Sequence, residues 1–330
     1  TIFAAMIVAV TGASGHIGIN LLPLLIEKGY EVRVLVHKNT KAFEGMDVTP
    51  VKGDLMDKQS LIECIDGAQV LIHLAGVITL EKKSAEVLKV NIEGTRNLLD
   101  AAKELGVKKF IFFSSIHALN VFPLTGIMDE TRELNKESPF DYDQSKVKGE
   151  EMVMEASGNG FSTVILNPTA VLGPNDFKPS QLGRALIQYY KGNIPATLNG
   201  GYDFVDVRDV ADATVKAIEK GRNGHRYIIS GNWKSIMELG ETVHRFGGSK
   251  APKITVPFWL ARLGAGFLNH FSSGKDEERL FAPASLDTLE NSHRNISNQK
   301  AIHDLGYHPR YFDQTIRDTI EWFKLNNYLP

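Results

Sequence analysis

The chain has 330 residues, of which 43% are hydrophobic and 23% are charged, and its formal net charge is −2 at pH 7. This composition predicts a globular protein with a sizeable core, and the charge argues against a nucleic-acid-binding or membrane-surface protein, which would be basic. A single cysteine, Cys64, excludes an intramolecular disulfide and favours a reducing, cytoplasmic location. The five residues before Met6 are expected to be an expression leftover, with the natural start at Met6.

The N-terminal half alternates apolar runs with helical patterns. Strands are predicted within residues 6–12, 31–37, 48–54, 68–76, 108–115 and 161–167, and helices over residues 17–28, 58–65, 84–105 and 142–156. Near-continuous apolar strands that alternate with helices indicate an α/β fold, with a doubly wound parallel sheet covered by helices on both faces. We therefore expect one domain over residues 6–167.

The pattern changes after Pro168, where proline and glycine become frequent and helices dominate. Helices are predicted over residues 235–246, 258–269, 298–305 and 312–325. We expect residues 168–330 to form mainly a smaller, mostly helical lobe. Short strands near residues 204–207 and 226–230 are expected to rejoin the main sheet. The most apolar long stretch, residues 254–271, is interrupted by Arg262 and His270, which argues against a membrane span.

A glycine-rich turn follows the first predicted strand, in "VAVTGASGHIGINLL". Gly12 would allow the tight turn, Gly15 would let the backbone approach a pyrophosphate, and Gly18 would permit close packing of helix and sheet. The strand–turn–helix context predicts a dinucleotide site, to which Ser14, His16 and Ile17 of the same turn would also contribute. The alternative is a glycine-rich turn without a ligand.

The end of the second predicted strand bears on the choice of dinucleotide. An acidic residue there would bind the ribose 2′-hydroxyl of NAD. The sequence instead has His37 and Lys38, with no acid before Glu44. This basic pair favours NADP(H), while NAD(H) stays possible because both side chains could simply be solvated.

Tyr142 and Lys146 are spaced by four residues in the predicted helix over residues 142–156. This spacing places both side chains on one helix face. By itself the pair is a weak signal, because chance alone produces such spacings.

An ordered set of motifs makes the signal specific: "TGASGHIG", "KGDLMD", "LIHLAG", "VNIEGTRNLLDAA", "FIFFSS", "YDQSK", "LNPTAVLGP" and "FVDVRDVADA". In this order they resemble the extended short-chain dehydrogenase/reductase family, of the NAD(P)-dependent epimerase/dehydratase type, over nearly the whole chain. The resemblance implies a Rossmann-type NAD(P)-binding domain and a C-terminal substrate-binding lobe. The chain is most similar to the dihydroflavonol-reductase and cinnamoyl-CoA-reductase branch.

The resemblance also assigns roles by position. The catalytic set would be Ser115, Tyr142 and Lys146, with Tyr142 as acid/base, Lys146 lowering its pKa and Ser115 stabilising a substrate oxyanion. Tyr142 and Lys146 would also touch the cofactor. The remaining cofactor contacts implied by the family are Asp54, Leu55, Leu74, Ala75, Gly76, Asn91, Ser114, Asn167 and Pro168.

The reaction implied is NADP(H)-dependent reduction of a small-molecule aldehyde or ketone. The alternatives are an epimerase or dehydratase of a sugar or nucleotide-sugar, and a catalytically silent NADP-binding regulator. Nucleotide-sugar members usually carry an arginine where this chain has Tyr202, and "LRP" is "LNP" here, which favours the reductase. We expect no metal, a monomer or homodimer, and tentative substrate contacts at His117, Phe122, Thr169, Asp176, Lys178 and Tyr202.

Overall fold

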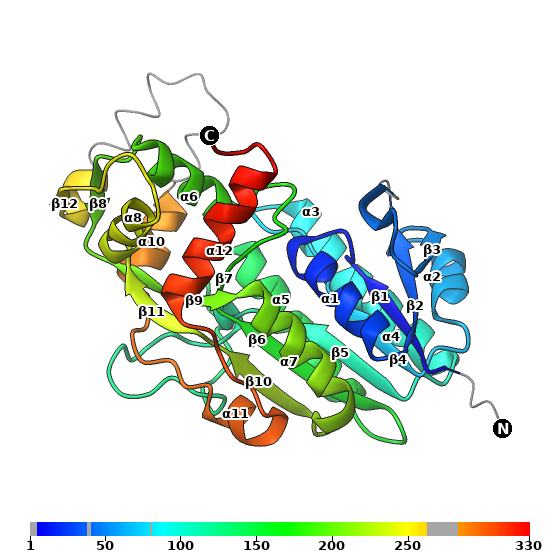
Figure 1. The fold of residues 1–330 in the computed structure, drawn as a ribbon. Coiled ribbons are helices and arrows are strands. Elements are labelled where there is room, and N and C mark those ends of the chain that lie inside the picture. The colour runs from blue at the N-terminus through cyan, green and yellow to red at the C-terminus, as the bar shows by residue number, and fades with distance from the viewer. Residues whose placement is uncertain (1–4, 38–40, 80, 263–282) are drawn as a thin grey trace.

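The computed structural model describes residues 5–37, 41–79, 81–262 and 283–330. Its main sheet has seven parallel strands in the order β10-β6-β5-β4-β1-β2-β3 (Figure 1). The strands are β1 (Ile7–Thr11), β2 (Glu31–Val36), β3 (Thr49–Lys52), β4 (Val70–His73), β5 (Lys109–Phe113), β6 (Ser162–Pro168) and β10 (His225–Ile229). The predicted doubly wound parallel sheet is confirmed.

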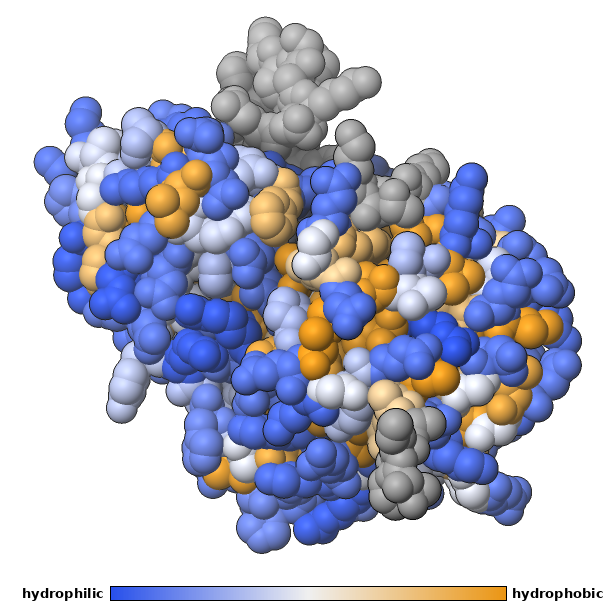
Figure 2. Space-filling view, turned by 45° about the vertical axis from the view of Figure 1, so that its right-hand side comes forward, coloured by the Kyte–Doolittle hydropathy of each residue, from blue (hydrophilic) through white to orange (hydrophobic). Residues whose placement is uncertain are grey.

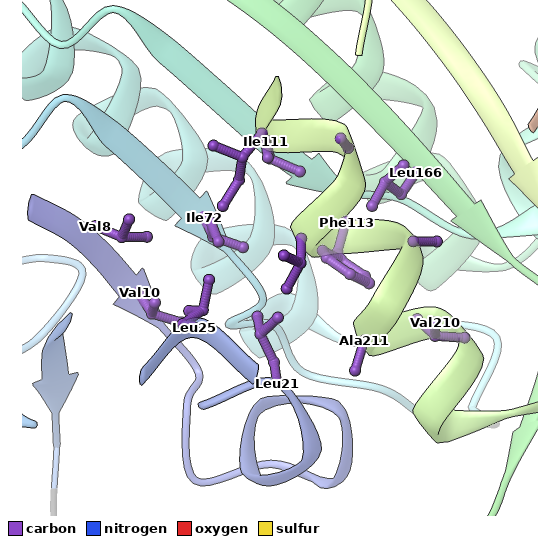
Figure 3. Packing of buried hydrophobic residues seen from close by; sticks show 14 of the residues in the cluster. Val8, Val10, Leu21, Leu25, Ile72, Ile111, Phe113, Leu166, Val210 and Ala211 are labelled. Carbon is purple, nitrogen blue, oxygen red and sulfur yellow. The ribbon is translucent and has the colours of Figure 1, made fainter. Parts of the chain in front are cut away.

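Helices cover both faces of this sheet because its strands are apolar on both sides. On one face lie α1 (His16–Glu27) and α7 (Val207–Lys220), whose residues Leu21 and Val210 pack with Val10 and Leu166 of the strands (Figure 3). On the other face lie α2 (Lys58–Ile65), α4 (Gly94–Glu104) and α5 (Asp141–Ala156). The short helix α3 (Ala85–Leu88) and a π-helical turn (Lys89–Glu93) lead into α4, so the helix predicted over residues 84–105 contains a bulge.

The second lobe is built on two small sheets, with strand orders β11-β9-β7 and β12-β8. Their strands are β7 (Ala170–Leu172), β8 (Ala196–Leu198), β9 (Gly201–Asp206), β11 (Asn232–Ser235) and β12 (Ile254–Val256). The lobe also contains α6 (Gln181–Lys191), α8 (Ile236–Arg245), α10 (Pro283–Glu290) and α12 (Phe312–Leu325), while α11 (Gln299–Leu305) lies against α7 and β10. Figure 1 shows this lobe at the upper left, beside the carboxyl ends of the main strands.

One expectation about the C-terminal half needs correction. The strand near residue 226 does join the main sheet, as β10 beside β6, but the one near residue 204 does not. That strand, β9, pairs with β7 and β11 instead, because the chain leaves the main sheet at Pro168 and α7 separates β9 from β10. The helix α7 was not predicted, and the helix predicted over residues 258–269 falls largely outside the described residues.

Polar contacts join the two lobes at the start of α7. Asp206 caps this helix, and the Arg208 guanidinium bonds both to Asp206 and, at 2.8 Å, to Asp318 of α12. Thr315 of α12 donates to Asp206 at 2.8 Å. A helix of the main sheet and a helix of the second lobe therefore share one partly buried charged cluster.

The surface shown in Figure 2 is mostly hydrophilic, with apolar residues gathered near the middle of that face. Within the described part of the chain, none of the helices has the length and apolar character needed to span a membrane.

Candidate active site at the carboxyl ends of the strands

The residues predicted to bind cofactor and to catalyse meet at one edge of the main sheet. Strands β1, β4, β5 and β6 are parallel neighbours, and the predicted residues follow directly after each of them. Loops at the carboxyl ends of parallel strands lie side by side, which is where ligands bind in such sheets.

The glycine turn after β1 has the geometry expected of a dinucleotide cradle. Gly12 has φ +72°, and a Cβ there would collide with the backbone of Ala75. A Cβ on Gly18 would lie under 3.0 Å from the backbone of Ala13, so the first turn of α1 can pack against the preceding turn only with glycine there. Gly15 is the N-cap of α1 and has no side chain to occupy the first amides, which leaves this helix end able to bind an anion.

The other residues of this turn differ in their surroundings. Ser14 is exposed, and Ile17 packs against the core beneath the turn. The Nε2 of His16 contacts the carbonyl oxygens of Gly173 at 3.2 Å and Pro174 at 3.0 Å. His16 thereby attaches the start of α1 to the loop after β7, which leads into the second lobe.

The loops after β2 and β3 face each other. The Nε2 of His37 lies 3.3 Å from Oδ2 of Asp54, and both side chains are exposed. Lys38 lies outside the described residues. The side chain of Leu55 is buried against α4. The predicted contact of Leu55 with an adenine would therefore have to come from its main-chain atoms.

A buried histidine that the sequence analysis did not assign supports the loop after β4. Thr95 donates to the carbonyl of Asn91 at 2.6 Å, so it must accept the bond from Nε2 of His73 at 3.0 Å. The Nδ1 of His73 then accepts from Thr11 at 2.8 Å. Burial lowers the pKa of His73 to about 3, which keeps it neutral. A histidine within the apolar run "VLIH" was the available signal.

Asn91 lies in the π-helical turn and holds the loop of Leu74, Ala75 and Gly76 against α5. Its Oδ1 accepts from the amide of Val77 at 2.8 Å, and its Nδ2 donates to Ser145 at 2.9 Å. Such bulges are frequent at functional sites because they turn a side chain out of the regular helical register. The amide therefore links the loop after β4 to α5.

Ser115, Tyr142 and Lys146 come together at this edge. Ser115 follows β5 and begins a 3₁₀ turn (Ile116–Ala118), where its Oγ accepts from the amide of His117 at 3.2 Å, and its hydroxyl lies near the phenol of Tyr142 on α5. Lys146 lies one helical turn further, with its Nζ 5.9 Å from the centre of the Tyr142 ring and bonded to the carbonyl of Phe113 at 2.8 Å.

The pKa of Tyr142 is shifted in the opposite direction from that expected. Burial raises the pKa of the phenol to about 12, outweighing the nearby hydroxyl of Ser115, which lowers it. The same burial lowers the pKa of Lys146 to about 8, against the influence of Glu150. Tyr142 is therefore held in its neutral, proton-donating form.

The residues between the strand ends and the glycine turn fit a nicotinamide dinucleotide. Among the described residues, the buried hydroxyl of Ser114 has no hydrogen-bond partner, and it lies next to Ser115 at the end of β5. This orphaned group, the uncapped start of α1 and the glycines at positions 12 and 18 are features that a bound dinucleotide would explain. Pro168, the last residue of β6, lies at the same edge.

Asn167, predicted to contact the cofactor, has a side chain held by protein groups. Its side chain is fully buried, and Nδ2 donates to the carbonyl of Ser115 at 3.0 Å and to the carboxylate of Glu150 at 2.6 Å. The amide thus lies behind the serine, within the protein.

The tentative substrate contacts divide into two groups. His117 stays near the reactive residues, because its ring lies 6.4 Å from that of Tyr142 and its Nδ1 is 3.8 Å from Asp143. Phe122 and Lys178 are exposed on loops. The other three already have protein contacts: Thr169 donates to Asp203, Asp176 accepts from the amide of Ser180, and Tyr202 packs against Phe204. Their contact with a substrate stays a prediction.

Two surface hollows lie elsewhere. One of about 270 Å³ is lined by Tyr30 and Glu31, and one of about 350 Å³ by His225 and Arg226. Both lie at the amino ends of strands, away from the catalytic residues. Among the described residues, no group of histidine, cysteine and acidic side chains is arranged to hold a metal ion.

Known proteins are similar to this chain over nearly its whole length. The model of the NAD dependent epimerase/dehydratase family matches residues 8–230. Sterol demethylase protein B of Methylococcus capsulatus is 30% identical, over 97% of this chain and 98% of that protein. A putative dihydroflavonol 4-reductase of Synechocystis sp. is 31% identical, over 97% of this chain and 95% of that protein. The crystal structure of gox2253 has a TM-score of 0.84 at 28% identity, over 99% of this chain and 100% of that one.

Proposed function

The chain belongs to the NAD dependent epimerase/dehydratase family and is an enzyme, and on this premise we propose that it reduces a small-molecule aldehyde or ketone with NADP(H). The observation that carries the proposal is the meeting of Ser115, Tyr142 and Lys146 at the carboxyl edge of the sheet, next to the glycine turn. The predicted resemblance to dihydroflavonol reductases is confirmed by the relative from Synechocystis sp..

The proposed mechanism assigns one task to each residue. When bound, NADPH supplies the hydride. Tyr142 donates its proton to the substrate oxygen, which its raised pKa allows because the phenol stays protonated at neutral pH. Ser115 donates a hydrogen bond to the same oxygen as negative charge develops there. Lys146 is one turn from Tyr142 and would bind the nicotinamide ribose and help to restore the proton.

Two arginine-related observations favour a carbonyl reductase over a nucleotide-sugar enzyme. Tyr202, at the position where the nucleotide-sugar branch usually has an arginine for the diphosphate, packs against the aromatic core of the second lobe. Arg208, the nearest arginine in sequence, is bound by Asp206 and Asp318. Neither residue is available to a diphosphate. The names of the two relatives support an apolar carbonyl substrate such as a ketosteroid or a dihydroflavonol.

The experiment that tests the reaction is a carbonyl panel assayed by NADPH consumption. The panel contains ketosteroids, dihydroflavonols, simple aromatic aldehydes and, as the competing class, UDP-sugars. Stoichiometric loss of NADPH with a carbonyl compound supports the proposal. Conversion of a UDP-sugar without net loss of NADPH would replace it with the epimerase or dehydratase function, which the name of the family model favours.

Tyr142→Phe tests the proton donor. We expect kcat to fall by about 100-fold or more, because the substrate oxygen loses its acid, while NADPH binding is retained. The matched control is Tyr311→Phe, at an exposed position in front of α12, which should leave kcat unchanged. Near-normal kcat in Tyr142→Phe would remove the tyrosine from the mechanism.

A further inference from the structure

A fully buried carboxylate lies one helical turn beyond Lys146. Glu150 of α5 is 0% exposed, and removing such a group from water is costly unless partners compensate. Two partners come from the underlying sheet. Nη2 of Arg226, on β10, lies 2.9 Å from Oε2, and Nδ2 of Asn167, on β6, donates to Oε1 at 2.6 Å. Strands from two distant parts of the sequence therefore hold this carboxylate in place.

Asn167 connects the carboxylate to the catalytic serine. The two hydrogens of its Nδ2 go to Glu150 and to the carbonyl oxygen of Ser115, the latter at 3.0 Å. Both partners are acceptors, so the orientation of the amide is determined. The main chain at Ser115 is consequently fixed relative to Glu150.

The same carboxylate faces Lys146 along the helix, because residues four apart share a face. Burial lowers the pKa of Lys146 to about 8, and the negative charge of Glu150 acts against this shift. The other titratable groups around Lys146 are Tyr142 on α5 and the neutral His73 on β4. Arg226 on β10 is the cation paired with Glu150.

We propose that Glu150 is a positioning residue of the reaction: its buried carboxylate supplies the negative charge that faces Lys146 and, through Asn167, holds the main chain of Ser115. The inference rests on the proposed catalytic roles of Ser115, Tyr142 and Lys146. Arg226, whose Nη2 lies 2.9 Å from Oε2, offsets the cost of burying this carboxylate.

The test removes the charge while keeping the shape. Glu150→Gln retains an oxygen that can accept from Asn167, but it leaves the partly buried Arg226 without its carboxylate partner. The double variant Glu150→Gln/Arg226→Met removes both charges and guards against simple unfolding. For each protein, kcat/KM and the dissociation constants of NADPH and NADH are measured across the neutral and alkaline range, together with the melting temperature.

In the wild type we expect kcat/KM to fall as pH rises through about 8, where Lys146 loses its proton. In both variants this fall should move to lower pH by about one unit, because the charge that favours protonated lysine is gone. Cofactor affinity should weaken over the same shifted range, since Lys146 would bind the ribose.

The control is Glu151→Gln, the neighbouring glutamate, which pairs at the surface with Lys136 and Lys148. Its pH profile should match the wild type. An unchanged profile and unchanged cofactor binding in the double variant, with only a lower melting temperature, would reduce Glu150 to a structural residue and overturn the proposal. If the wild type turns over no carbonyl, the proposed function fails by itself, and the pH dependence of cofactor binding still decides the role of Glu150.

Discussion

Burial shifts the pKa values of Tyr142 and Lys146, which lie one helical turn apart, in opposite directions. Both leave water on folding, and desolvation favours the neutral form of each: the pKa of the phenol rises to about 12 and that of the amine falls to about 8. The phenol thus stays protonated at neutral pH and able to donate a proton, while the lysine titrates close to neutral pH. This asymmetry suits reduction, in which a proton must be given to the substrate oxygen.

His37 is the residue with the most direct bearing on cofactor choice. Its exposed ring stands at the end of β2, where an acid would select NAD, and Asp54 lies 3.3 Å from it. The wild type should prefer NADPH, and His37→Asp should lower kcat/KM for NADPH by about tenfold or more relative to NADH, because a carboxylate repels the 2′-phosphate. The measurement is the ratio of the two kcat/KM values. His308→Asp, at an exposed site after α11, is the control, and a wild type that prefers NADH would contradict the assignment.

At the scale of elements, helices with a strong apolar periodicity were predicted correctly. The pairing of β9 was not, because it depends on residues far apart in the sequence. The predicted helices over residues 17–28, 58–65 and 312–325 match α1, α2 and α12 within a residue, because each buries one apolar stripe. The π-helical turn left no trace in the pattern. The partner of β9 was also unpredictable, since a short apolar run does not indicate which sheet it joins.

In the site, too, residues in local motifs were predicted and those that depend on long-range pairing were not. Ser115, Tyr142 and Lys146 were identified from local motifs, and they meet in the structure. Glu150 could have been noticed from its spacing to Lys146, but its partner Arg226 depends on β10 lying beside β6. Long-range pairing of this kind is not encoded in any local stretch of sequence.

Gly18 tests how closely α1 must pack against the glycine turn that precedes it. In Gly18→Ala the new methyl group would meet the backbone of Ala13, which cannot rotate away, so the helix must move. We expect a loss of about 1–3 kcal/mol in the free energy of unfolding and weaker NADPH binding. Chemical denaturation and fluorescence titration measure the two effects. Glu27→Ala, at an exposed position of the same helix, should change neither, and a Gly18→Ala protein of wild-type stability and affinity would show that the contact is loose.

At the scale of the whole molecule, the two lobes are joined by charge as well as by packing. Arg208 at the start of α7 binds Asp206 and Asp318, and Arg310 binds Asp209 of the same helix. Contacts with Arg208 hold the pKa of Asp206 below its usual range even though burial acts to raise it. The catalytic edge lies beside this junction, so the orientation of the lobes depends on it.

Arg208→Leu should destabilise the protein by about 3 kcal/mol, because Asp206 loses its cation in a buried site. Since the junction couples both lobes, calorimetry should show one cooperative transition, shifted to lower temperature. Arg317→Leu is the matched control, because Arg317 also pairs with Asp318 but is half exposed, and it should shift the transition little. Two separate transitions in the wild type would mean that the lobes unfold independently.

The place of β10 in the sheet has a consequence for synthesis on the ribosome. The edge of β6 gains its partner only when His225–Ile229 has emerged, after β7, β8, β9 and α7 have been translated. Until then only the β5 side of β6 can be paired, its other edge faces water or other chains, and Glu150 lacks Arg226. In a nascent chain that pauses before residue 225, the sheet and the surroundings of Glu150 are therefore both incomplete, and both depend on the same late segment.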